Sequence, residues 1–249
     1  MNWKFKLLVL SAVILSLTAC NQEKKTNEES ENIQVNDSVS VSSGDVLTKE
    51  EQEALTPDEV IELLKEGNNR FINDDMTVRN HTEQIRKSAK AQYPKAIVLS
   101  CVDSRVPVED VFDLGIGDLF VARVAGNFVN EDILGSMEFA CKVSGSKLVL
   151  VMGHEHCGAI KAAVDDVKLG NITPMLQNIR PAVEGVKYEG ERSSENQEFV
   201  HMVAERNVLD NIDEIRDNSP ILKEMEDNGE IKIVGAVYDM DNGKVDWLE

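Results

Sequence analysis

Four short apolar runs, separated by longer amphipathic segments, constrain the fold of this chain more than any other feature. They are Lys95–Ser100, Leu119–Val124, Lys147–Met152 and Ile231–Tyr238. Each run has the length and the branched side chains of a buried strand. Strands that alternate with helices indicate an α/β fold, a mostly parallel β-sheet flanked by helices on both faces.

The segments between the runs carry helix signals. Thr56-Pro57-Asp58-Glu59 combines a capping residue, a proline in the first turn and two acidic residues, so a helix is expected from there to Phe71. Four more helices are expected over residues 81–91, Ile133–Val143, Cys157–Val167 and 195–216.

Residues 1–19 have the pattern of a lipoprotein signal peptide. Lys4 and Lys6 precede an apolar run that is too short to span a bilayer, for which about 20 residues are needed. The run closes with Leu17-Thr18-Ala19-Cys20, which predicts cleavage before Cys20, lipidation of its thiol and export to the envelope side of a bacterial membrane. An ordinary secretory signal cut nearby is the alternative.

Residues 20–53 are expected to form a flexible acidic tether, and residues 54–249 a single folded domain. The tether has no apolar periodicity, so it cannot bury enough surface to offset the entropy of ordering. The chain carries a formal net charge of −19, which argues against nucleic acid as a partner. The same charge disfavours electrostatic membrane contact, so the lipid anchor is the only membrane attachment expected.

Three residues with metal-binding side chains follow two of the apolar runs. Cys101 comes directly after the first run, and His154 and Cys157 come after the third. Ligands of parallel sheets bind at the carboxyl ends of strands, so we expect these residues to meet there. Thiolates and imidazole suit zinc, and three protein ligands leave one tetrahedral position open, as in catalytic sites. Cys141 lies in an expected helix and is interpreted as a buried, inert thiol.

The motif Cys101-x-Asp103-Ser104-Arg105, followed by His154-x-x-Cys157-Gly158, resembles the β-class carbonic anhydrases. Further similarity to that family covers most of residues 54 to 246, in the segments Gly67–Phe71, Arg123–Asn127, Gly135–Ala140 and Gly235–Asp239. The resemblance implies that Cys101, His154 and Cys157 bind one Zn²⁺ per subunit. It also implies reversible hydration of CO₂ to bicarbonate and a proton by a zinc-bound hydroxide.

The resemblance assigns roles to further residues. Asp103 is expected to orient the hydroxide, and Arg105 to hold Asp103 through a bidentate ion pair. Family members are dimers or larger and place pocket residues across the subunit interface, so a homodimer or homotetramer is expected. A substrate pocket is expected from Gln92, Phe120, Phe139 and Gly158, with a surface position for Gln92 and core packing for the two aromatic residues as the alternatives.

Other functions fit parts of the same pattern. A carbon disulfide hydrolase would keep the fold and the zinc, and a non-catalytic zinc-binding lipoprotein would keep the ligands alone. The Asp103–Arg105 pair argues against storage, since storage requires no oriented hydroxide. A redox protein using Cys101 and Cys157 is disfavoured by His154 at ligand spacing. His156 either relays protons to buffer or is a turn residue.

Overall fold

The computed structural model describes residues 45–248. The predicted signal peptide, Cys20 and most of the predicted tether therefore lie outside the described residues. Within residues 45–248, the helices are either too short or too polar to cross a membrane.

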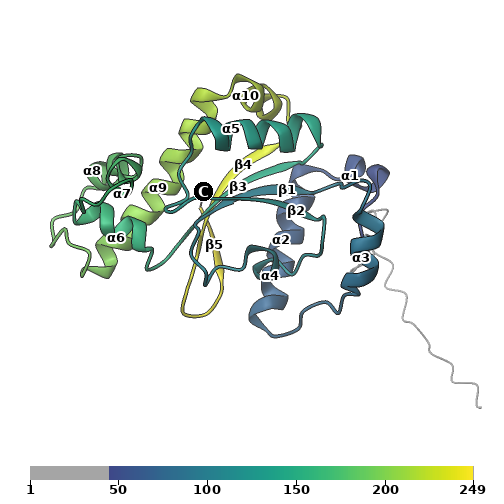
Figure 1. The fold of residues 1–249 in the computed structure, drawn as a ribbon, viewed down its shortest axis with the longest axis horizontal. Coiled ribbons are helices and arrows are strands. Elements are labelled where there is room, and N and C mark those ends of the chain that lie inside the picture. Colours follow the sequence, from purple (N-terminus) through teal and green to yellow (C-terminus); the bar gives the residue numbers. More distant parts are fainter. Residues whose placement is uncertain (1–44, 249) are drawn as a thin grey trace, which may run out of the picture. The chain divides into compact units, whose positions relative to one another are not determined.

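A five-stranded sheet with the strand order β2-β1-β3-β4-β5 forms the centre of the fold (Figure 1). The first four strands in this order run parallel, whereas β5 is antiparallel to β4. The α/β fold with a mostly parallel sheet is thus confirmed, and each expected strand is present. The strands are β1 (Ala96–Ser100), β2 (Leu119–Arg123), β3 (Leu148–His154), β4 (Lys232–Tyr238) and β5 (Val245–Leu248).

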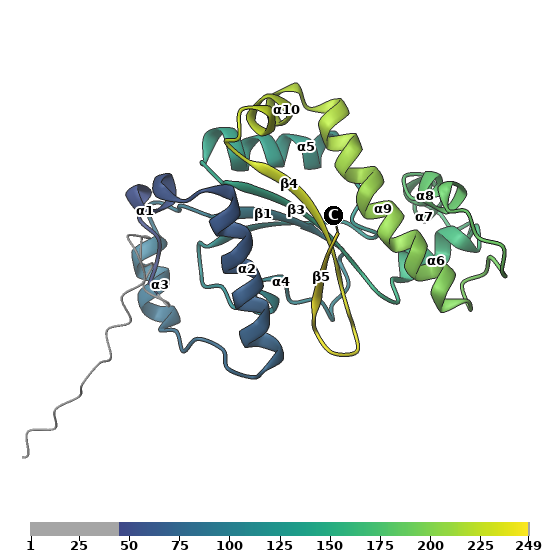
Figure 2. The same ribbon diagram turned by 180° about the vertical axis from the view of Figure 1, so that it is seen from behind.

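Two groups of helices cover the two faces of the sheet. One face packs against α2 (Pro57–Ile72) and α4 (Val108–Val111) through side chains such as Leu64 and Phe112, and the residues on either side of α1 (Lys49–Ala54), Leu47 and Leu55, join the same core. The other face packs against α5 (Glu131–Glu138), the π-helical turn η1 (Phe139–Val143), α9 (Gln197–Asn218) and α10 (Pro220–Asp227). Figure 2 shows α9 running from this face toward α6 (Gly158–Val164). The remaining helices are α3 (His81–Ser88), α7 (Ile172–Leu176) and α8 (Arg180–Gly185).

The helix predicted after Thr56 is present, because the Thr56 side chain accepts a hydrogen bond from the Glu59 N–H while Glu59 bonds back to the Thr56 backbone. The other expected helices are also present, with shifted ends. The expected helix beginning at Ile133 starts two residues earlier, since Asn130 caps it by accepting from the Ile133 N–H.

The folded part of the chain begins before residue 54, contrary to the predicted extent of the tether. Leu47 is buried in the core, and α1 lies within the segment expected to be flexible. Gln52 is also buried and donates to the carbonyls of Pro94 (2.7 Å) and Ser144 (2.9 Å). These partners are distant in sequence, so local composition did not reveal that Gln52 anchors this segment.

Candidate metal centre and active site

The carboxyl ends of β1 and β3 bring three metal-binding side chains together. Cys101 follows β1, His154 is the last residue of β3, and Cys157 is the cap of α6. Their ligand atoms all lie within 4.8 Å of one another, and all three residues are buried. The two Sγ atoms are 4.0 Å apart, and the described cysteines form no disulfide. The register of the parallel strands explains this meeting, since Ser100 pairs with Met152, two residues before His154.

One ring nitrogen of His154 is free to bind a metal. Nδ1 lies 2.8 Å from the carbonyl oxygen of Glu155, which requires Nδ1 to carry the proton. Nε2 therefore presents its lone pair, and it is buried without a hydrogen-bond partner among the residues that the structure describes. A buried polar atom without a partner is costly. A carbonyl on the far nitrogen is also the usual arrangement of a metal-binding histidine, so the donor set fits a zinc ion.

The two thiols beside His154 differ in acidity. The hydrogen bond between the two sulfurs lowers the pKa of Cys101 to about 4, and the N–H of Gly126 adds a hydrogen bond at 3.4 Å to Cys101 Sγ. The pKa of Cys157 is raised by the same hydrogen bond and by burial. Cys101 is thus the readier thiolate, the form that binds metals. By contrast, burial alone raises the pKa of Cys141 to about 12, as suits an inert core thiol.

Asp103 faces the cluster of metal-binding residues, and Arg105 holds the Asp103 carboxylate in place. Arg105 donates from Nε to Oδ1 (2.9 Å) and from Nη2 to Oδ2 (2.8 Å), and its backbone N–H adds a third bond at 3.0 Å. These bonds hold the pKa of Asp103 well below its usual range. The Oδ2 atom lies 3.9 Å from Nε2 of His154. A carboxylate that is ionised and fixed in direction therefore borders the position where a metal would bind.

Arg123, at the end of β2, holds the turn that carries Asp103. Its guanidinium donates to the carbonyls of Asp103 (3.3 Å) and Val106. The sequence placed Arg123 in a similar motif but gave it no role. The spacing of 20 residues between Arg123 and Asp103 carried no signal, because the contact depends on β2 lying beside β1.

The four expected pocket residues lie in different places. Gly158 begins α6 next to the cluster, and a Cβ atom added there would meet no other atom within 4 Å. Gln92 is exposed ahead of β1, at the end of that strand opposite Cys101. Phe120 and Phe139 contact each other edge to face with 6.1 Å between ring centroids, and both line a pocket of about 550 Å³. Within one chain, only Gly158 is therefore adjacent to the metal-binding residues.

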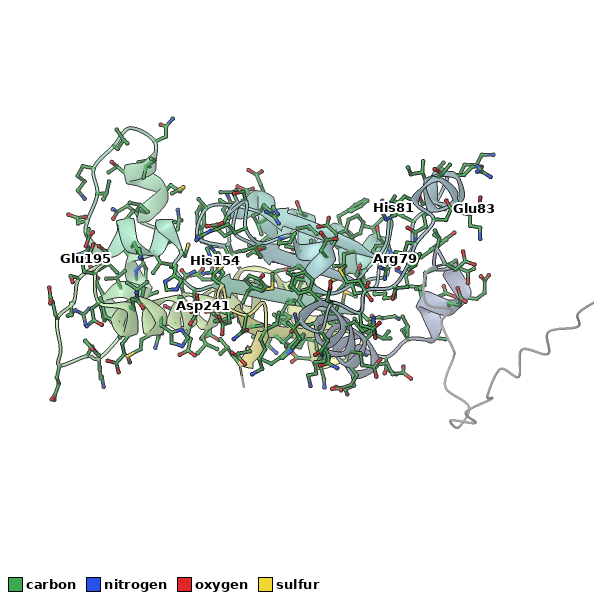
Figure 3. The ribbon with its side chains drawn as sticks, turned by 90° about the horizontal axis from the view of Figure 1, so that it is seen from below. Arg79, His81, Glu83, His154, Glu195 and Asp241 are labelled. Carbon is green, nitrogen blue, oxygen red and sulfur yellow. The ribbon has the colours of Figure 1, made fainter. Side chains whose placement is uncertain are left out.

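His156 is not part of the group of three buried ligands. It has a left-handed backbone (φ 53°), and its side chain approaches those of Glu155 and Asp241 at the surface. Glu155 is also paired with His201 at 3.3 Å. Figure 3 shows Asp241 on the same side of the molecule as His154, and His81 at the opposite end.

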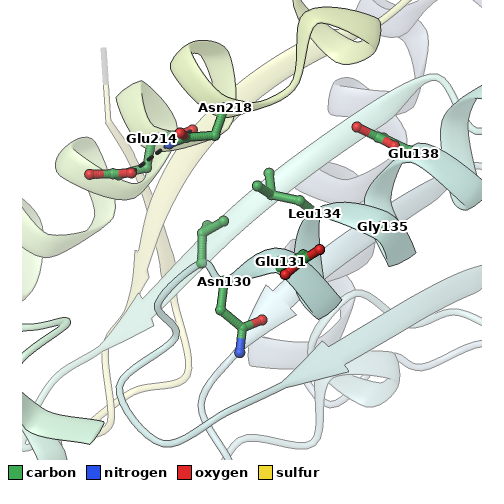
Figure 4. A pocket seen from close by; sticks show the side chains of 8 residues that line it. Asn130, Glu131, Leu134, Gly135, Glu138, Glu214 and Asn218 are labelled. Carbon is green, nitrogen blue, oxygen red and sulfur yellow. Dashed lines mark hydrogen bonds between the residues drawn. The ribbon is translucent and has the colours of Figure 1, made fainter. Parts of the chain in front are cut away.

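A separate pocket of about 610 Å³ opens between α5 and α9 (Figure 4). Three glutamates, Glu131, Glu138 and Glu214, contribute to its lining, and none of the metal-binding residues does. Its acidic lining would repel an anion, and this pocket is separate from the cluster at the ends of β1 and β3.

The sequence matches the model of the carbonic anhydrase family over residues 96–245. Carbonic anhydrase 2 of Mycobacterium tuberculosis is 34% identical to it over 187 residues, which cover 73% of this chain and 87% of the relative. The chain therefore belongs to the carbonic anhydrase family and is an enzyme of its β class, for which the family establishes CO₂ hydration as the activity.

Solved β-carbonic anhydrases have the same fold. The Coccomyxa enzyme, solved in complex with acetazolamide, superposes with a TM-score of 0.60 at 25% identity, covering 76% of this chain and 85% of that one. One of the tetrameric β-carbonic anhydrases of Sordaria macrospora superposes with a TM-score of 0.58 at 23% identity, covering 66% and 85%.

Proposed function

We propose that the chain hydrates CO₂ reversibly at a zinc ion held by Cys101, His154 and Cys157. The observation that carries this proposal is the unpartnered Nε2 of buried His154, which lies with two thiols inside a 4.8 Å cluster. Two thiolates and one neutral imidazole suit Zn²⁺ and leave its fourth position for a reactant. When bound there, zinc would lower the pKa of a water so that a nucleophile exists near neutral pH.

Asp103 and Arg105 would supply direction to the reaction. The Asp103 carboxylate can accept a hydrogen bond from the attacking nucleophile, which would aim the free lone pair at the carbon of CO₂. Arg105 fixes that carboxylate with three hydrogen bonds and keeps it ionised. This pair favours catalysis over zinc storage, because storage would not require a carboxylate held against the metal position.

The intact pair also supports an active arrangement at rest. In some relatives the matching aspartate moves onto zinc and blocks the site, whereas here Arg105 holds both oxygens of Asp103. Two thiolates neutralise the charge of Zn²⁺ and should acidify water less than three histidines would. We therefore expect kcat to rise from neutral to alkaline pH, and a rate that is flat over this range would contradict the ligand set.

The positions of the expected pocket residues support a site completed by a second copy of the chain. Phe139 is 51% exposed, Phe120 is partly buried on edge strand β2, and Gln92 is exposed. We propose that these residues line the site of a partner subunit, so that the enzyme is at least a homodimer. The Sordaria macrospora structure described as tetrameric makes a homotetramer the larger alternative. Sedimentation equilibrium distinguishes these states, and a monomer with full activity would refute the shared pocket.

We also propose that the enzyme is anchored to a bacterial membrane through a lipid on Cys20 and works in the cell envelope. The motif Leu17-Thr18-Ala19-Cys20 after a short apolar run supports this proposal. Metabolic labelling with palmitate and membrane fractionation test it. The native chain should be labelled and sediment with membranes, and the Cys20→Ser variant should be neither labelled nor processed.

Stopped-flow CO₂ hydration by the zinc-loaded protein tests the proposed reaction. The native enzyme should turn over rapidly, and Asp103→Asn should keep its zinc but lose about 100-fold or more in kcat/KM, the scale of a lost acid–base group. Asp241→Asn is the matched control, since that carboxylate lies at the surface outside the cluster, and it should retain full activity. An Asp103→Asn variant as active as the native enzyme would remove Asp103 from the mechanism.

A further inference from the structure

Two buried asparagines stand on α9, a helix whose other inward side chains are mainly apolar. Asn207 is 1% exposed and Asn211 is 5% exposed, and they occupy one face of the helix one turn apart. Buried amides are costly unless their hydrogen bonds are satisfied. Both bind the loop that leads from β2 to α5, and this loop reaches the Cys101 sulfur.

Asn207 and Cys101 hold opposite sides of one residue, Gly126. The Gly126 N–H donates to Cys101 Sγ (3.4 Å), and its carbonyl accepts from Asn207 Nδ2 (2.9 Å). Gly126 has a left-handed backbone (φ 83°), and a Cβ atom there would lie 2.4 Å from Ile179 Cδ1. This conformation suits only glycine, which is the most mobile residue. An external bond is therefore needed to keep the N–H aimed at the sulfur.

Asn211 supports this arrangement from the next turn of α9. Its Nδ2 donates to the backbone carbonyl of Asn207 (2.7 Å) and contacts Asn207 Oδ1 at 3.3 Å. Its Oδ1 accepts from the N–H of Val129 (2.6 Å). The helix thus fixes both ends of the Gly126–Val129 loop and sets which atom of the Asn207 amide faces Gly126.

We propose that Asn207 is a positioning residue for the metal centre, which acts by holding the Gly126 N–H on the Cys101 sulfur. This inference rests on the proposed zinc site. A hydrogen bond to a metal-binding thiolate withdraws electron density from the sulfur, and bonds of this outer kind are typically worth 10–100-fold in metal affinity. Asn211 orients Asn207 and has the smaller effect.

The test compares Asn207→Leu with Val208→Ala in the full-length protein. Leucine removes the amide while keeping a similar volume. Val208 is buried on the same helix and packs against the Gly153 and Gly235 backbones, so its truncation shows what a general packing defect in this helix does without touching the loop. Two readouts are taken: the zinc dissociation constant from competition with a chromophoric chelator, and the thiolate-to-metal absorption band of the Co²⁺-loaded protein.

In Asn207→Leu, zinc should bind about 10-fold or more weakly, and the Co²⁺ band should move to longer wavelength because the sulfur has lost a donor. Val208→Ala should change neither. Asn207→Ser, whose hydroxyl is too short to replace the amide, gives the same test if Asn207→Leu does not fold, and Asn211→Leu should shift both readouts in the same direction by less. Variants that fold and match Val208→Ala in both readouts would overturn the role of Asn207. A native chain that binds neither zinc nor Co²⁺ would instead refute the proposed function.

Discussion

Two parts of the molecule treat buried polar groups in opposite ways. In the segments that lead into β1 and β2, Lys95 is paired with Asp118, and buried Asp113 accepts from Arg70 and Arg79 (2.5 Å each). At the carboxyl ends of β1 and β3, His154 Nε2 has no hydrogen-bond partner among residues 45–248, and two thiols lie beside it. Both parts contain buried titratable groups, so burial alone does not mark a site. The distinction is that the paired charges complete the fold, whereas the unpartnered nitrogen and the thiols can bind a metal.

Removal of one metal-binding side chain at the carboxyl ends of β1 and β3 should have the largest effect. Cys157→Ala should weaken zinc binding by more than about 100-fold, since even outer-shell partners of a metal are worth 10–100-fold, and CO₂ hydration should fall with it. Cys141→Ala is the control, because Cys141 is equally buried but lies apart from the cluster. Zinc content after dialysis decides, and zinc retained by Cys157→Ala would contradict the ligand assignment.

Removal of the paired charge of Asp113 should destabilise the fold and leave zinc binding unaffected. Asp113→Asn should lower the free energy of unfolding by about 3 kcal/mol, because Arg70 and Arg79 lose their shared partner. Urea denaturation measures this loss, with zinc content measured in parallel. A variant that is as stable as the native chain, or one that loses zinc, would contradict the distinction between paired charges and metal-binding residues.

The pH dependence of stability sharpens the same point. Burial opposes the ionisation of Asp113, but hydrogen bonds from Arg79, Arg70 and Thr77 outweigh it and lower the pKa to about 2. A folded-state pKa below the unfolded value of about 3.9 means that this contribution is fully present above pH 4 and is lost as pH falls toward 2. Between these values, the native chain should lose stability more steeply than Asp113→Asn. Parallel acid-unfolding curves would contradict this expectation.

A smaller loss of stability is expected where a neutral side chain, Gln52, binds the backbone ahead of β1 and β3. Gln52→Leu should cost about 2 kcal/mol, because the carbonyls of Pro94 and Ser144 would lose their donor. Gln177→Leu, which changes an exposed glutamine, is the control and should leave the urea midpoint unchanged. A Gln52→Leu midpoint equal to that of the native chain would show that α1 is not anchored by this side chain.

The sequence predicted the parts of the molecule that depend on local pattern. Apolar runs located β1 to β4, and strand ends located Cys101 and His154. Contacts between residues far apart in the chain could not be predicted from the sequence. Nothing near Gln52 announces its bonds to Pro94 and Ser144, and Asn207 meets Gly126 across 81 residues. The short strand β5 also escaped prediction, since Val245-Asp246-Trp247-Leu248 has too few residues to show a periodicity.

Zinc K-edge X-ray absorption on the purified full-length protein tests the central claim most directly, because it reads the atoms bound to the metal. The account predicts two sulfur ligands at about 2.3 Å and two nitrogen or oxygen ligands at about 2.0–2.1 Å. These would be Cys101, Cys157, His154 and one exchangeable group. Zinc without sulfur ligands, or a protein that binds no zinc, would contradict the assignment of Cys101, His154 and Cys157 as the metal centre.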